Sequence, residues 1–70
     1  MTAKEAMRRN VMRLLFDNDL SITDCAKKTG IPRSTIYSVT SGRVETSVSN
    51  ALKIAKAFGI TVDELLKGAE

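Results

Sequence analysis

Single glycines divide this sequence into short segments, and that division limits the folds open to the chain. The four glycines lie at positions 30, 42, 59 and 68 of 70 residues, and the apolar residues between them recur at helical intervals. No segment alternates apolar and polar residues over the length of a strand. Because a chain of this length holds one domain at most, we expect a single all-α domain over residues 1–70.

Apolar periodicity and capping residues together predict five short helices. We expect them over residues of about 3–17, 21–29, 32–41, 47–58 and 61–67. Ser21 with Asp24, and Thr61 with Glu64, have the spacing of capping boxes, in which side chains and backbone N–H groups pair at the start of a helix. The connections between the helices are then short, as is usual in a compact all-α domain.

The same periodicity predicts which residues are buried. The expected buried face comprises Met7, Val11, Leu14 and Leu15 in the first helix and Val48, Ala51, Leu52, Ala55 and Phe58 in the fourth. In the third helix Ile36 and Val39 point one way, and the polar side chains point other ways. Cys25 is expected to be a small buried apolar residue.

The residue types that are missing exclude several kinds of chemistry. The chain has no His and one Cys, so it can form no Ser-His-Asp triad, no Cys-His pair, no Cys/His zinc site and no internal disulfide. We therefore expect no enzyme, no metal, no cofactor and no small-molecule ligand. No apolar run approaches the ~20 residues of a membrane span, and no signal-peptide pattern opens the chain, so we expect a cytoplasmic protein without a membrane partner.

The net charge of +3 is unevenly distributed along the chain. Residues 25–43 carry four basic side chains and no acidic one, whereas residues 17–24 carry three aspartates. The all-basic middle segment favours a polyanionic partner, and the acidic stretch beside it predicts that the electrostatic attraction is modest.

The basic segment contains the pattern of two helices joined by a tight turn. The turn is Gly30-Ile31-Pro32, and the small side chain of Ala26 lets the second helix cross close to the first. Ile36 then fastens the second helix to the core. This arrangement is typical of a helix-turn-helix, whose second helix leaves its outer face free for a groove of DNA.

Further residues match a known family. In the first half they are Leu20-Ser21, Cys25-Ala26, Gly30-Ile31, Arg33-Ser34-Thr35-Ile36 and Gly42-Arg43. In the second half they are Leu52, Ile54-Ala55, Ala57-Phe58-Gly59-Ile60 and Thr61-Val62-Asp63-Glu64-Leu65-Leu66, the most specific part. Through these residues the sequence resembles the Cro/C1-type (XRE-like) helix-turn-helix proteins over residues 11–66, and most of all a small phage or prophage Cro-type repressor.

The resemblance implies a compact five-helix, lambda-repressor-like DNA-binding domain. It implies a Cro-like repressor that binds a double-stranded DNA operator sequence-specifically, as a homodimer at least on DNA. The residues at base-contact positions are Arg33, Ser34, Tyr37 and Ser38, and those at phosphate-contact positions are Ser21, Thr35, Arg43 and Ser47. Arg33 is the main candidate, because a guanidinium can form two hydrogen bonds with one guanine.

Some of these positions have simpler interpretations. Arg33 has the alternative roles of a solvated charge or a phosphate contact. Tyr37 packs against sugar or a thymine methyl in one interpretation and covers the edge of the core in the other. Ser21 and Ser47 are expected to cap helices whether or not they also contact DNA.

The sequence also departs from the family pattern. Ile22 occupies the place of a glutamine that contacts the DNA backbone in many members. Leu15 and Thr40 replace a paired arginine and glutamate, and Thr46 replaces a proline before the fourth helix. The lost contact at Ile22 and the serine-rich third helix motivate an alternative function, a protein-interaction module such as an antitoxin-type partner-binding protein.

Overall fold

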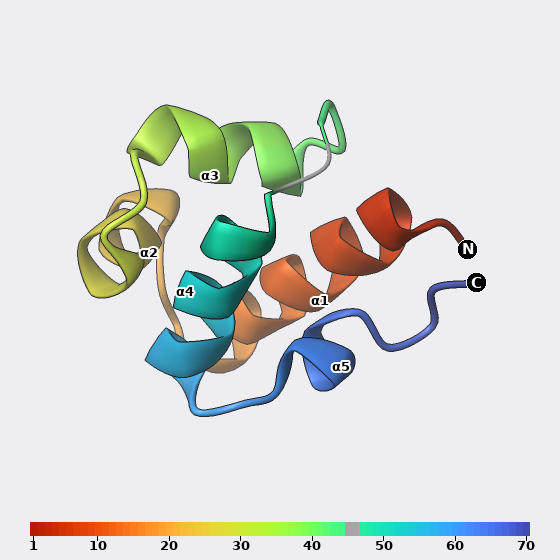
Figure 1. The fold of residues 1–70 in the computed structure, drawn as a ribbon. Coiled ribbons are helices and arrows are strands. Elements are labelled where there is room, and N and C mark those ends of the chain that lie inside the picture. The colour runs from red at the N-terminus through yellow and green to blue at the C-terminus, as the bar shows by residue number, and fades with distance from the viewer. Residues whose placement is uncertain (45–46) are drawn as a thin grey trace.

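In this computed structural model, which describes residues 1–44 and 47–70, the chain forms five helices (Figure 1). They are α1 (Ala3–Asp17), α2 (Ile22–Thr29), α3 (Arg33–Thr40), α4 (Val48–Phe58) and α5 (Val62–Leu65). No strand occurs in the described residues, so the expected all-α class is confirmed. α2, α3 and α4 each begin one residue later than predicted, because Ser21, Pro32 and Ser47 are N-caps.

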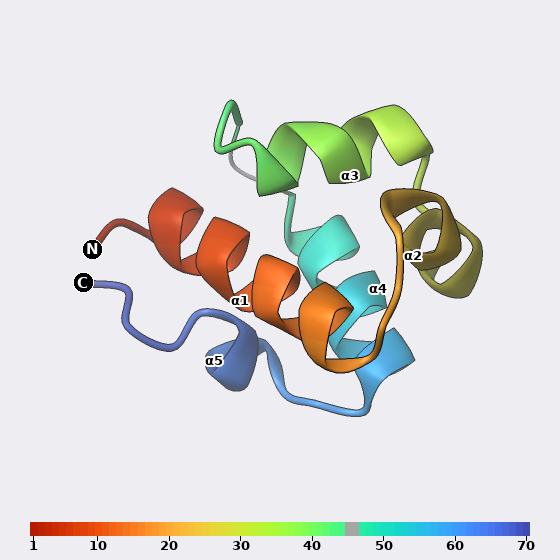
Figure 2. The same cartoon turned by 180° about the vertical axis from the view of Figure 1, so that it is seen from behind.

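Each of the five helices packs mainly against two others. α1 contacts α3 and α5, while α2 packs against α3 and α4. Figure 2 shows from behind that α3 lies along one edge of the molecule and α5 near the opposite edge. The two termini lie side by side, and the backbone N–H of Glu70 donates to the Met1 carbonyl at 2.8 Å.

The core draws on all five helices and on the turn between α2 and α3. Its largest fully buried side chains are Ile31, Ile36, Ile54, Leu65, Val11, Val39 and Cys25. Full burial of an aliphatic side chain is worth ~1.5–3 kcal/mol, so these few residues supply most of the stability of a small domain. Across residues 1–44 and 47–70, no helix has the length and apolar character needed to cross a lipid bilayer.

The predicted buried face of α4 is wrong at three positions. Val48 and Leu52 are 78% and 54% exposed, whereas Ile54, which was not predicted to be buried, is fully enclosed. Both stripes of residues have helical spacing, so periodicity alone did not choose between them. Packing of α4 against α2 and α5 selects the stripe that contains Ala51, Ile54 and Ala55. Thr46, which stands where the family pattern has a proline, lies outside the described residues.

The predicted extent of the fifth helix is also wrong, because α5 ends at Leu65. The Asn10 side chain donates to the carbonyls of Leu65 at 2.7 Å and Lys67 at 3.1 Å, so an α1 side chain replaces the backbone donors of a longer helix. Thr61 caps the helix by accepting from the Glu64 N–H at 3.0 Å. The Glu64 carboxylate faces the Thr61 hydroxyl at 3.4 Å instead of the Thr61 N–H, so only half of the predicted capping box forms.

Candidate nucleic-acid interface

The turn between α2 and α3 is fixed by hydrogen bonds within a few residues. Gly30 has φ of 75° and donates its N–H to the Ala26 carbonyl at 2.9 Å, a left-handed helix end that favours glycine. Thr29 Oγ1 donates to the Cys25 carbonyl at 2.8 Å and accepts from the Ile31 N–H at 3.2 Å. The turn therefore holds α3 against α2 in one orientation, as the recognition helix of a helix-turn-helix requires.

α2 begins with the capping box that the sequence predicts. Ser21 Oγ accepts from the Asp24 N–H, and the Asp24 carboxylate accepts from the Ser21 N–H, both at 3.1 Å. The hydrogen bonds to Ser21, first from its backbone and then from its side chain, lower the pKa of Asp24. A carboxylate therefore lies at the start of α2, and the neighbouring Ile22 side chain offers no hydrogen bond to DNA.

α3 has one buried face and one exposed face. Ile36 and Val39 are buried, as predicted. Arg33, Ser34 and Tyr37 are exposed, with Tyr37 at 53%. The helix forms an edge of the molecule (Figure 1), so its outer face is open along its length.

The exposed face of α3 borders a surface hollow, which we call the α3 hollow. Its lining residues are Ile22, Arg33, Ser34, Tyr37, Ser38 and Arg43. All four residues at predicted base-contact positions are thus brought together with one residue at a predicted phosphate-contact position. Ile22 also lines the hollow, although it was not among the predicted contact residues. The one indication in the sequence was its departure from the family pattern at this position.

The hydroxyl groups of Ser38 and of the C-cap Ser41 donate to backbone carbonyls of α3. Ser38 Oγ donates to the Ser34 carbonyl at 3.0 Å, and Ser41 Oγ donates to the Ser38 carbonyl at 3.1 Å. With the proton directed to the backbone, the oxygen retains lone pairs. Ser38 can therefore accept from the amino group of an adenine or a cytosine in the major groove.

The other residues at phosphate-contact positions lie apart from the α3 hollow. Ser47 is the N-cap of α4, and its Oγ accepts from the Asn50 N–H at 3.1 Å, as Ser21 does at α2. In both cases the oxygen is occupied as an acceptor and the hydroxyl proton remains to donate to a phosphate. Thr35 is partly buried, and Ser21 and Ser47 are exposed. Both serines lie at helix N-termini, where the helix dipole favours an anion.

Comparisons with known proteins agree with this geometry. A family model described as helix-turn-helix matches residues 12–65 of the chain. A relative from Methanocaldococcus jannaschii, described as an uncharacterized HTH-type transcriptional regulator, is 38% identical over 48 residues, which cover 69% of this chain and 73% of the relative. No solved structure matches the chain significantly.

Proposed function

This chain belongs to the Cro/C1-type helix-turn-helix family, and we propose that it is a sequence-specific DNA-binding transcriptional regulator, a Cro-like repressor that acts in the cytoplasm. The observation that carries the proposal is the α3 hollow, where four exposed or partly exposed side chains of α3 and Arg43 share one surface. The M. jannaschii relative, described as a transcriptional regulator, supports the same class of function.

In the proposed complex, α3 lies in the major groove and its residues divide between bases and backbone. Arg33 pairs with a guanine, and Ser34, Tyr37 and Ser38 contact neighbouring base edges. The residues proposed to contact phosphates are Ser21, Thr35, Arg43 and Ser47. Because Asp24 carries a negative charge at the start of α2, that helix start attracts the DNA backbone only weakly, and Arg43 is the charged residue among those proposed to contact phosphates.

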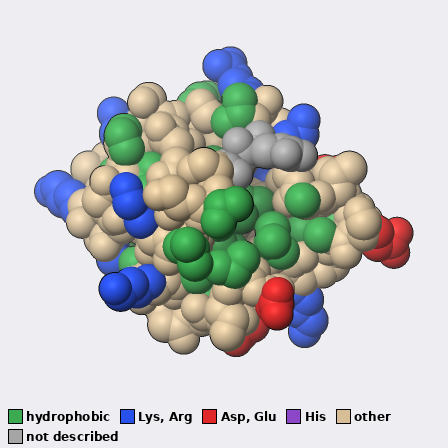
Figure 3. Space-filling model, viewed as in Figure 1, with side chains coloured by type: hydrophobic (Ala, Val, Ile, Leu, Met, Phe, Trp, Pro, Cys, Tyr) green, Lys and Arg blue, Asp and Glu red, His purple; other side chains and the backbone are tan. Residues whose placement is uncertain are grey.

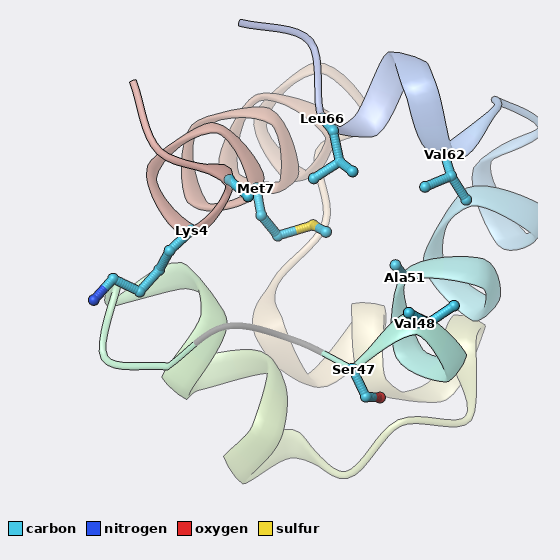
Figure 4. Close-up of a pocket in the computed structure, with 8 residues that line it drawn as sticks. Lys4, Met7, Ser47, Val48, Ala51, Val62 and Leu66 are labelled. Atoms are coloured by element: carbon cyan, nitrogen blue, oxygen red, sulfur yellow. The ribbon is translucent and has the colours of Figure 1, made fainter. Parts of the chain in front are cut away.

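We further propose that the protein binds DNA as a homodimer, through an apolar face on α1, α4 and α5. Figure 3 shows hydrophobic side chains gathered near the centre of one face of the molecule. A groove there is lined by Ala3, Lys4, Met7, Ser47, Val48, Ala51, Val62 and Leu66, drawn in Figure 4. Val48 and Leu52, one turn apart on α4, are exposed. Exposed side chains and an apolar hollow on one face are what a two-fold symmetric contact requires, since each copy must offer both.

The experiment that tests the function is selection from a random double-stranded DNA library, followed by titration of the enriched duplex at several salt concentrations. A dimer making about six to eight phosphate contacts is expected to give a log–log slope of about −5 to −7 and to enrich a palindrome. No enrichment, or a slope near zero, contradicts DNA recognition. Placing the enriched site over a reporter promoter tests repression, because increased transcription would identify an activator.

A further inference from the structure

A second surface hollow continues from the α3 hollow and is apolar. We call it the α1–α3 groove, and its lining residues are Met12, Leu15, Phe16, Ile22, Tyr37, Thr40 and Ser41. Ile22 and Tyr37 line both hollows. The groove lies between two helices and borders the proposed reading surface, so whatever occupies it affects access to α3.

The side chains at the rim of the groove are unusually exposed for their size. Phe16 is 86% exposed, Tyr37 53% and Met12 45%, while Leu15 is buried beneath them. Met12 and Phe16 are four residues apart, so they lie along one strip of α1. Clustered aromatic and methionine side chains around a hollow mark a protein-binding surface, because they offer large apolar area to a partner.

The departures from the family pattern meet in this groove. Leu15, Ile22 and Thr40 all line it. The three positions at which this chain lacks the ion pair and the glutamine of the family pattern therefore lie together. Thr40 Oγ1 donates to the carbonyls of Ile36 and Tyr37, both at 3.1 Å, so its hydroxyl proton is directed to its own helix. The surface of the groove is thus mostly apolar, and the hydroxyl protons of Thr40 and Ser41 are directed to backbone carbonyls.

Within residues 1–44 and 47–70, no charged residue lines the α1–α3 groove itself, and the nearby basic side chains lie in the adjoining α3 hollow and at the end of α3. Arg33 and Arg43 line the adjoining α3 hollow. A Cβ placed on Gly42 would lie 3.1 Å from Arg8 Cδ, so Arg8 lies against the end of α3. Among the described lining residues of the two hollows there is no carboxylate. A ligand that combines a continuous apolar strip with negative charge therefore suits both hollows together, and an amphipathic protein helix offers both, whereas DNA offers charge with only small apolar groups such as a sugar or a thymine methyl.

We propose that the α1–α3 groove binds an acidic amphipathic helix of a partner protein. The apolar edge of that helix packs against Met12, Phe16 and Tyr37, and its acidic edge pairs with Arg33 and Arg43. Because the two arginines and Tyr37 also belong to the proposed DNA interface, partner and DNA compete for the same protein. The competition rests on the proposed function, while the binding of the helix does not.

The test uses a synthetic amphipathic peptide of about five helical turns, with Leu and Phe at spacings of three and four and Glu on the adjoining strip. Its fluorescence anisotropy is measured against the protein, beside a scrambled peptide of the same composition and a peptide with Lys in place of Glu. Only the acidic amphipathic peptide is expected to bind. The double variant Met12→Ser/Phe16→Ser should weaken it by at least about tenfold, whereas Val44→Ser, which removes an exposed side chain outside the groove, should not.

Each remaining outcome decides between occupants. Equal binding of the three peptides, or no loss in the double variant, overturns the proposal. If the double variant loses self-association in sedimentation and the peptide does not bind, the occupant is a second copy. If it loses DNA affinity instead and the peptide does not bind, the groove belongs to the DNA interface. A peptide that binds the groove while no duplex binds the protein would uphold this inference and contradict the proposed function.

Discussion

At the scale of single residues, two arginines near opposite ends of α3 have different expected roles. Arg33 is the first residue of the helix, and Arg43 follows Gly42 in the connection after it. A residue at the start of a recognition helix reaches base edges, whereas a residue in a loop beside that helix reaches the DNA backbone. Substitutions that separate charge from geometry therefore distinguish the two roles.

Arg33→Lys keeps the charge and removes the planar fork of the guanidinium. We expect it to lose ~1–3 kcal/mol of discrimination at one base pair, with little change in the salt slope. Arg43→Gln should instead weaken binding to all sequences alike and reduce the salt slope by about one. Competition among single-base-pair variants of the selected duplex measures both. If Arg33→Lys leaves both the base-pair discrimination and the salt slope unchanged, Arg33 contacts a phosphate and not a base.

A buried asparagine is the residue-scale feature that holds the end of the chain in place. Asn10 is 7% exposed, and its amide donates to the carbonyl of Leu65, the last residue of α5, and to that of Lys67 beyond it. Asn10→Ala leaves both carbonyls without this donor, so we expect a loss of ~1–3 kcal/mol in the free energy of unfolding by urea. Asn18→Ala is the matched control, because the exposed Asn18 amide donates to the Leu14 carbonyl at 2.8 Å and water can replace it. Similar losses in the two variants would contradict the role assigned to Asn10.

At the scale of elements, α1 and α2 both begin with complete capping boxes, Thr2 with Glu5 and Ser21 with Asp24. Hydrogen bonds from the cap residues lower the pKa of Glu5 and of Asp24 below their ordinary values. A carboxylate whose pKa is lower in the folded state stabilises that state when it is ionised. The contribution is therefore complete above the ordinary pKa of about 4 and is lost as the pH falls through the lowered value.

The expected result is a melting temperature that changes little between about pH 7 and pH 5 and falls below about pH 4. The chain has no His, so no side chain has an ordinary pKa between pH 5 and pH 7. The double variant Glu5→Gln/Asp24→Asn should be less stable at neutral pH and should flatten the acid limb of the curve. Thermal unfolding followed by circular dichroism measures this, and an unchanged acid limb would assign the pH dependence to other carboxylates.

The elements also differ in how far the sequence predicts them. α1 extends over the predicted residues, and Ser21 caps α2 as predicted, because capping and helix spacing depend on residues within one or two turns of each other. The buried face of α4 was not predicted correctly, since a helix with several apolar stripes is oriented by its neighbours. The end of α5 was missed because a side chain of α1 determines it.

At the scale of the whole molecule, the proposed homodimer face and the α1–α3 groove are distinct surfaces. Leu52→Glu places a charge at an exposed position of α4, one turn from Val48, which lines the groove on α1, α4 and α5, and we expect it to abolish self-association without unfolding the domain. Phe16→Glu is the matched control, because it places the same charge at an exposed apolar position on the other surface. Sedimentation equilibrium with and without the palindromic duplex measures both. If only Phe16→Glu abolishes the dimer, the two-fold contact lies at the α1–α3 groove instead.

The candidate site was partly predictable as well. The sequence alone indicated Arg33, Ser34, Tyr37 and Ser38, because resemblance assigns them to one helix whose inner residues are apolar. Their contact with DNA stays a prediction. The sequence did not indicate that Met12 and Phe16 lie beside Tyr37, since that neighbourhood arises from the packing of α1 against α3.

By itself, then, the sequence determined the existence of the five helices, the cap of α2 and the turn between α2 and α3. These features are local: Gly30 ends α2 whatever the rest of the chain does, and Ser21 pairs with a residue three positions away. Only the tertiary structure decided which side of α4 is buried, where α5 ends and which side chains line the groove beside α3. The Asn10 amide meets the Leu65 carbonyl across 55 positions of sequence. Contacts of that kind form only when distant helices pack, and no local pattern specifies them.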